Sequence, residues 1–218
     1  MIPIRDVIPT RTAPRVTIAL MAVHAVVAAV VLLAPEDTRR LLILTYGLTP
    51  AQWAWLPATT ATLMHVGTLS LASDLLALWI FGSTLEDRLG HLRYLTFYLL
   101  AGYAGGVADC WAAPGSAAVV EAGSAVAGLI GGYMATFPRS RVLMLVPLWR
   151  SVDLVEVPVF LLPGFWLLGQ AVASVTLWDF AADTRGSIWS IVAGGAFGAA
   201  SIWVFRQPAR QRVEWWGV

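Results

Sequence analysis

The side chains that could do chemistry in this chain are few, and they lie within long apolar runs. Asp74 is one of them, and an ionisable group inside a run long enough to span a membrane is a candidate for function. Ser124, near the start of another such run, is a candidate nucleophile, which needs a general base within hydrogen-bond reach. No histidine follows His91 and no lysine occurs anywhere, so the second half of the chain offers neither an imidazole nor an amine as that base.

Three of the polar positions have a structural interpretation beside the functional one. Asp74 can serve a function, or it can be protonated or bonded to Ser70 or Ser73. For His65 we expect a structural hydrogen bond. His24 stands in the middle of an apolar run, where we expect packing or an inter-helix hydrogen bond, with ligation of a haem or pigment as the alternative. No resident metal or cofactor is expected.

Composition places these side chains in a membrane protein. Of the 218 residues, 58% are hydrophobic and 12% are charged, and the mean hydropathy is +0.73. Soluble domains carry about 25% charged residues, so half of the usual charge is missing. The net charge of +1 says nothing about nucleic acid, because the charges sit in the connections rather than in a patch, and no nucleic-acid partner is expected. The single cysteine, Cys110, excludes an internal disulfide and a cysteine-rich metal site.

Six apolar segments approach the length of roughly 20 residues that crosses the hydrocarbon core. We predict an all-α protein with transmembrane helices over about 16–33, 58–81, 94–111, 122–137, 157–177 and 187–205. Residues 1–218 are expected to form a single membrane domain, with a polar lead at 1–15, an interfacial connection at 34–57 and an Arg/Trp tail at 206–218. The tail is typical of an anchor to anionic lipid, and a docking tail is the alternative.

Arginine placement predicts the orientation of these helices. With the N-terminus in the cytoplasm, the outer side holds Arg39, Arg40 and Arg185. The inner side then holds the remaining eleven arginines, Arg5, Arg11, Arg15, Arg88, Arg93, Arg139, Arg141, Arg150, Arg206, Arg210 and Arg212. This positive-inside bias predicts cytoplasmic termini. The lack of lysine and the excess of alanine indicate a GC-rich bacterial genome, and hence the bacterial inner membrane.

Glycines predict how the helices pack. Three segments each carry a Gly-x-x-x-Gly pair: Gly102 and Gly106, Gly128 and Gly132, and Gly194 and Gly198. Hydrogen in place of a side chain lets helix backbones approach closely, which favours association in lipid. We therefore expect a tightly packed bundle.

Several ordered motifs carry a family resemblance. Gly82, Glu86 and Gly90 form a Gly-x-x-x-Glu-x-x-x-Gly turn, directly after a Trp-x-Phe-Gly stretch. The fourth segment, from Ala122 to Tyr133, has the small-residue pattern of a serine-bearing helix. With these motifs and the long outer first connection, the chain from about residue 60 to 205 resembles the rhomboid family of intramembrane serine proteases, in its compact bacterial six-helix form. The resemblance implies a six-helix bundle that cleaves peptide bonds with a Ser–His dyad.

When the family's catalytic positions are carried over one by one, the residues of the Ser–His dyad differ in this chain. The nucleophile falls at Gly123, five residues before Gly128, and Ser124 stands where the family has glycine. One helical step turns a side chain by about 100°, so Ser124 would be a displaced nucleophile. The general base falls at Ile191 or Val192, and both side chains are aliphatic.

The oxyanion side is altered as well. The family's His-x-x-x-x-His-x-x-x-Asn pattern falls on His65, Ser70 and Asp74. An asparagine amide donates hydrogen bonds, whereas an ionised aspartate only accepts them. We therefore expect His65, Ser70, Asp74 and Ser124 to line a cavity that binds but does not cleave.

The leading hypothesis is a rhomboid-like pseudoprotease that binds other transmembrane proteins in the bilayer, either as a client-binder or as a subunit of a larger membrane complex. The alternative is a divergent active protease that uses Ser124. A transporter or channel is disfavoured, because the segments show no inverted repeat and no series of membrane charges beyond Asp74.

Overall fold

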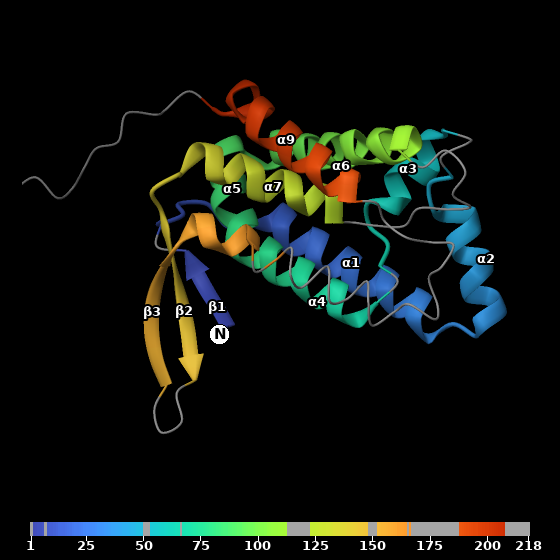
Figure 1. Ribbon diagram of the computed structural model, residues 1–218, viewed down its shortest axis with the longest axis horizontal. Helices are drawn as coiled ribbons and strands as arrows, with labels where there is room; N and C mark the ends of the chain where they lie inside the picture. The colour runs from blue at the N-terminus through green and yellow to red at the C-terminus, as the bar shows by residue number, and fades with distance from the viewer. Residues whose placement is uncertain are drawn as a thin grey trace, which may run out of the picture.

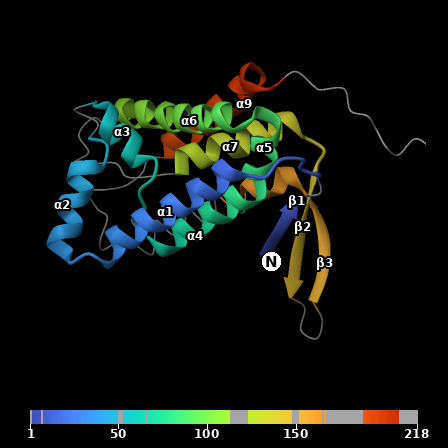
Figure 2. The same cartoon turned by 180° about the vertical axis from the view of Figure 1, so that it is seen from behind.

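The protein folds into a helical bundle with a small sheet at one end. The computed structural model describes residues 2–6, 8–49, 53–65, 67–112, 123–147, 152–164, 166 and 188–207. Its long helices are α1 (Arg15–Leu33), α6 (His91–Ala112), α7 (Gly123–Thr136) and α9 (Ile188–Phe205). In both views α6, α7 and α9 lie together, and α1 runs beside α4 (Thr68–Ala77) (Figures 1 and 2).

Two helical stretches of the described chain are long and apolar enough to cross a membrane. They are Arg15–Leu33, with a hydropathy of 2.7, and Thr68–Leu89, with 1.4, and Trp189–Phe205 is a shorter apolar helix. Large apolar side chains on α1, among them Ile18, Val26 and Val30, are more than half exposed. The expected fifth segment, 157–177, lies mostly outside the described residues, as does the tail beyond Gln207.

The expected second helix, 58–81, has different bounds in the structure. Helix α3 (Trp55–Ala61) ends early, and the chain is extended at Gly67, with φ −142° and ψ 148°. From Thr68 the chain is then continuously helical through α4, the π-helical turn η1 (Leu78–Gly82) and α5 (Ser83–Leu89). Gly90 ends this stretch at φ 81°, a conformation that favours glycine. His65 therefore precedes the helix rather than lying on it.

The connection at 34–57 contains the helix α2 (Glu36–Tyr46) as well as the start of α3. Glu36 accepts hydrogen bonds from the Arg39 and Arg40 guanidinium groups in the first turns of α2. The bond from Arg39 is the main cause that holds the pKa of the Glu36 carboxyl below its usual value. Leu41 and Leu44 on the same helix are exposed. Such a mixed surface is typical of a helix that lies in a membrane interface.

The structure also contains a three-stranded antiparallel sheet, which was not predicted from the sequence. Strand β2 (Arg141–Pro147) pairs with β1 (Ile2–Asp6) on one side and with β3 (Val152–Pro158) on the other. Both views place the sheet at the end of the bundle where α1 begins (Figures 1 and 2). Val142 and Met144 are buried in the main core, as the two-residue period of a strand with one buried face requires.

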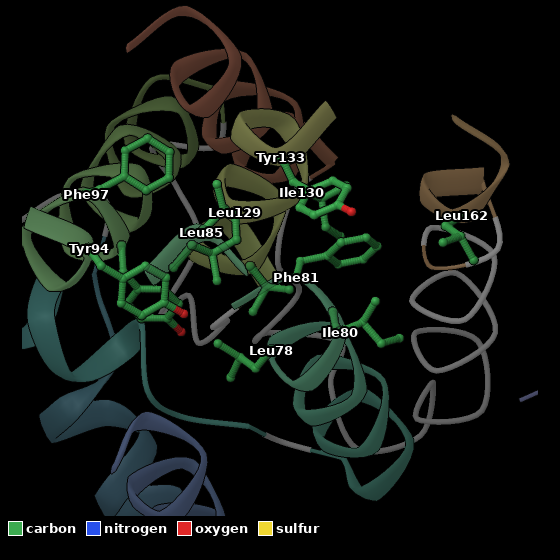
Figure 3. Packing of buried hydrophobic residues seen from close by; sticks show 14 of the residues in the cluster. Leu78, Ile80, Phe81, Leu85, Tyr94, Phe97, Leu129, Ile130, Tyr133 and Leu162 are labelled. Atoms are coloured by element: carbon green, nitrogen blue, oxygen red, sulfur yellow. The ribbon is translucent and has the colours of Figure 1, made fainter. Parts of the chain in front are cut away.

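Aromatic side chains fill the middle of the bundle. The Phe81 ring from η1 meets the Tyr133 ring from α7 at 4.9 Å between centroids, in an edge-to-face arrangement. Figure 3 shows these two rings beside Ile130. Leu162, from the chain that follows β3, stands to one side in this view and belongs to the same core cluster. Phe97 of α6 is fully buried in the same core.

A buried carboxylate holds the start of α1 against α5. Glu86 Oε1 accepts from the Val16 amide at 2.9 Å, and Oε2 accepts from the Thr17 amide at 2.8 Å and its hydroxyl at 2.7 Å. His91 Nδ1 also lies within hydrogen-bond distance of Oε1. The first amides of a helix have no partner within the helix, and a negative charge there interacts favourably with the helix dipole. Glu86, which lies on α5, thus accepts the hydrogen bonds of backbone amides in the first turn of α1.

Backbone contact joins α7 to α9. A Cβ atom added at Gly194 would lie 2.1 Å from the Ser124 carbonyl oxygen, and one added at Gly198 would lie 2.0 Å from the Gly128 carbonyl oxygen. In the opposite direction, a Cβ at Gly131 would lie 2.2 Å from the Gly195 carbonyl oxygen. No residue other than glycine can occupy these positions without moving a helix backbone.

We predict that Glu86→Gln lowers stability much more than Glu156→Gln does. The amide nitrogen of glutamine would face N–H donors, and a buried donor without an acceptor costs about 1–3 kcal/mol. Glu156 forms an exposed ion pair with Arg141 at 3.3 Å, worth at most about 1 kcal/mol. Reversible unfolding in detergent, followed by circular dichroism, measures both. Equal losses would contradict the capping role of Glu86.

We predict that Gly194→Ala disrupts the α7–α9 contact whereas Gly195→Ala is tolerated. The new methyl group at 194 would overlap the Ser124 carbonyl, and overpacking of this kind typically costs about 1–3 kcal/mol. At 195 the nearest atom to the added carbon would be the Ala127 carbonyl oxygen at 3.6 Å, an ordinary contact. The midpoint of unfolding in sodium dodecyl sulfate compares the two variants. A similar midpoint for both would show that α7 and α9 are not closely packed.

Candidate functional site

His65 and Asp74 form a buried pair. His65 Nε2 lies 3.2 Å from Asp74 Oδ2, and the two residues are 1% and 0% exposed. Nine residues of continuous helix would separate them by about 13.5 Å along the axis, at 1.5 Å per residue. The pair forms because residues 62–65 and Gly67 are not helical, and His65 therefore lies beside α4 instead of one helical stretch away from Asp74.

The other oxygen of Asp74 is bonded to a distant part of the chain. The indole N–H of Trp166 donates to Asp74 Oδ1 at 3.2 Å. Trp166 follows β3 and η2 (Val159–Leu161) in sequence, and it is partly buried against the main core. This bond therefore ties the middle of α4 to the chain that follows the sheet.

His24 lies next to this pair. Its Nε2 atom is 2.7 Å from the Tyr98 hydroxyl, and its ring meets the His65 ring edge to face at 5.1 Å between centroids. The Tyr98 hydroxyl also reaches the Thr62 carbonyl oxygen, at a long 3.4 Å. The imidazole of His24 is fully buried and its Nε2 faces a side chain of its own protein, so the arrangement is that of an inter-helix hydrogen bond.

These five residues, His24, His65, Asp74, Tyr98 and Trp166, are called the His–Asp cluster below. They come from α1, from the chain before α4, from α4 and α6, and from the chain after η2. Among the described residues, no group of three or more histidine, cysteine, aspartate or glutamate side chains is arranged to hold a metal ion. The contacts within the cluster are hydrogen bonds and ring contacts between side chains of the protein.

Ser124 lies apart from the His–Asp cluster in its contacts. It is 3% exposed in the first turn of α7, and its hydroxyl donates to the Gly102 carbonyl oxygen of α6 at a long 3.5 Å. A Cβ at Gly105 would lie 2.7 Å from the Ser124 Oγ atom and 2.8 Å from the Ser190 carbonyl oxygen. The hydroxyl thus faces the small residues of α6, as in a helix-packing serine. Gly123 is the first residue of α7 and is also buried.

The two candidate positions for a base lie on different sides of α9. Ile191 is partly buried and shares a helix face with Gly194 and Gly198, three and seven residues further on, which contact α7. Val192 is 53% exposed and points away from that contact. Ile191 is therefore the position from which a side chain would reach α7, and its side chain carries no proton acceptor.

Ser70 is buried near the start of α4, and its carbonyl oxygen accepts from the Ser73 hydroxyl at 2.8 Å.

Sequence reasoning missed the parts that Tyr98 and Trp166 play, because nothing in the chain signals a contact across 74 or 92 residues. It also overlooked Asp109, which is 1% exposed on α6. The presence of an acidic residue inside the predicted transmembrane segment 94–111 is the feature of the sequence that could have indicated Asp109.

The comparisons with known proteins agree with this architecture. The model of the rhomboid domain matches residues 50–208. The chain is also 29% identical over 152 residues to the Rhomboid protease GluP of Bacillus subtilis (strain 168), an alignment that covers 70% of this chain and 27% of that protein. This chain thus matches about a quarter of the length of that relative. A domain match over most of the chain, together with the helical bundle, shows that the protein is an integral membrane protein that belongs to the rhomboid family.

Proposed function

We propose that this rhomboid is a pseudoprotease that binds other transmembrane proteins without cleaving them. It acts in the bacterial inner membrane with both termini in the cytoplasm, either as a client-binder or as a subunit of a larger membrane complex. The observation that carries the proposal is the pair of residues at the dyad positions. Gly123 begins α7 and Ile191 is on the α9 face toward it, and neither can attack a carbonyl or accept a proton.

The polar groups that remain support the same proposal. Asp74 takes a hydrogen bond from Trp166 and lies beside His65, so its carboxylate is engaged within the protein. An oxyanion needs donors aimed at it, and a carboxylate at the position of an amide supplies none when ionised. Ser124 has its hydroxyl directed at a backbone carbonyl of α6 instead of at a base.

The exposed surface of α4 supports binding. Leu69, Ala72 and Trp79 are exposed on the same continuous helix as Asp74, within the segment long enough to cross a membrane. A neighbouring transmembrane helix can pack there by dispersion and by close approach over small residues. The glycine contact between α7 and α9 holds these two helices of the bundle close together.

A second candidate function is that of a divergent protease that uses Ser124. The named activity of the Bacillus subtilis relative favours it. The buried position of Ser124 against α6 argues against it, because a nucleophile needs both a base and access to the substrate.

We predict that the purified protein, reconstituted in vesicles, does not cleave a fluorogenic transmembrane peptide above background. Ser124→Ala should leave that signal unchanged, because the Ser124 hydroxyl is directed at the Gly102 carbonyl oxygen and not at a base. The Bacillus subtilis relative, assayed in the same vesicles, serves as the positive control. Cleavage that Ser124→Ala abolishes would instead establish the divergent protease.

We predict that a photo-crosslinking residue at position 72 on α4 captures transmembrane proteins in the native membrane. The same residue in place of Trp203, which is 56% exposed on α9, gives the background for a lipid-facing position. Mass spectrometry of the crosslinked species then separates the two modes of binding. One partner at near-equal amounts indicates a subunit of a complex, and a spread of single-span proteins indicates a client-binder. Identical products from both positions would contradict binding at α4.

A further inference from the structure

Strand β3 forms an open edge of the sheet. It pairs with β2 on one side, and among the described residues no strand lies along its other side. In both views β3 is the strand farthest from the helices, so this outer edge faces away from the bundle (Figures 1 and 2). Every second residue of an edge strand directs its backbone N–H and C=O groups outward, where another chain can bind them.

Little in the strand itself protects this edge. Leu154 and Val155 are 59% and 44% exposed, and because successive side chains of a strand point to opposite faces, both faces of β3 are accessible. Natural edge strands are usually blocked by charged side chains, by proline or by a covering element. In residues 154–157 Glu156 carries the one charge, and Pro158 comes at the end of the strand.

The Glu156 carboxylate gives the edge a negative charge that is only partly used. Its Oε2 atom accepts from the Arg141 guanidinium of β2 at 3.3 Å, and both side chains of this pair are at least half exposed. Within the part of the chain that the structure describes, Oε1 has no hydrogen-bond partner. The strand as a whole has two acidic residues and no basic one. A cation brought alongside β3 therefore meets an unshared carboxylate oxygen.

Membrane geometry restricts what can cover the edge. Two copies of the chain in one bilayer have the same orientation, so their β3 edges face the same aqueous phase and cannot lie edge to edge (Figures 1 and 2). This end of the bundle is the one that the arginines predict to be cytoplasmic. Segments that flank transmembrane helices on the cytoplasmic side carry an excess of lysine and arginine. Such a segment of another membrane protein has the charge that complements β3.

We propose that the outer edge of β3 binds an extended, basic cytoplasmic segment of another membrane protein, which is added to the sheet as a fourth strand. The inference rests on the function proposed above and names the part of the partner that is bound. Backbone hydrogen bonds hold an added strand of any sequence, and the side chains opposite β3 set the preference. An apolar residue fits opposite Val155 and a basic residue opposite Glu156, so the two types alternate along the added strand.

The test uses the full chain in nanodiscs of phosphatidylcholine and a labelled peptide of about eight residues, the length of an ordinary strand, in which arginine alternates with valine. Fluorescence anisotropy measures binding against empty nanodiscs. A second peptide has the same side chains but methyl groups on its backbone nitrogens, which removes its hydrogen-bond donors. A third peptide has glutamate in place of arginine. Only the first peptide should bind, and it should slow hydrogen exchange at the amides of β3.

Two matched variants assign the preference to Glu156. Glu156→Gln should weaken binding of the first peptide about three- to fivefold, the range that one exposed ion pair supplies. Glu36→Gln removes a carboxylate that is likewise paired with arginine, on α2 at the opposite end of the molecule (Figure 1), and should leave binding unchanged.

Equal binding of the methylated or the glutamate peptide would overturn the inference, as would equal effects of the two variants. Slow exchange at the β3 amides before any peptide is added would also overturn it, because another copy or another part of the chain would then cover the edge. None of these results bears on capture of partners at position 72 of α4. The client-binding function therefore stands or fails separately.

Discussion

Close contact between the backbones of α7 and α9 is the constraint on which the geometry of the two dyad positions depends. Gly194 lies against the Ser124 carbonyl, and Gly198 lies against the Gly128 carbonyl, with no room for a methyl group at either position. Because glycines fix both the distance and the register of the two helices, they also fix where every neighbouring side chain points. They place Ile191 on the side of α7, and they leave the Ser124 hydroxyl directed at α6.

Several buried polar groups show a second constraint, which is that a buried group is stabilised by a partner inside the bundle. Glu86 meets the first amides of α1, and in the His–Asp cluster Asp74 meets His65 and Trp166 while His24 meets Tyr98. Apart from the contact between His65 and Asp74, which are nine residues apart, these bonds join elements that are far apart in the sequence. They therefore specify one arrangement of the helices as well as satisfying the groups themselves. The scaffold does not depend on which residues occupy the dyad positions, because the glycine contacts and the Glu86 cap need neither a nucleophile nor a base.

Much of the architecture could be predicted from residue patterns. The bounds of α1, α6, α7 and α9 lie within a few residues of the apolar segments, because segment length and hydropathy are set locally. The sheet and the break before α4 could not be predicted in this way. The strands depend on pairing between residues near the N-terminus and residues beyond 140, and the break depends on the extended backbone at Gly67 in a run that is otherwise apolar enough to be helical.

The sequence by itself determined which side chains are missing: no histidine follows His91 and no lysine occurs, and no fold can supply a side chain that the chain does not contain. It could not determine what the remaining polar groups do, because partners at separations of 74 and 92 residues leave no local pattern. Only the tertiary structure decided that Ser124 packs on α6, that His24 bonds to Tyr98, and that Asp74 is held by His65 and Trp166. The physical reason is that hydropathy fixes which segments become helices, whereas close packing and the satisfaction of buried donors and acceptors fix how those helices face one another.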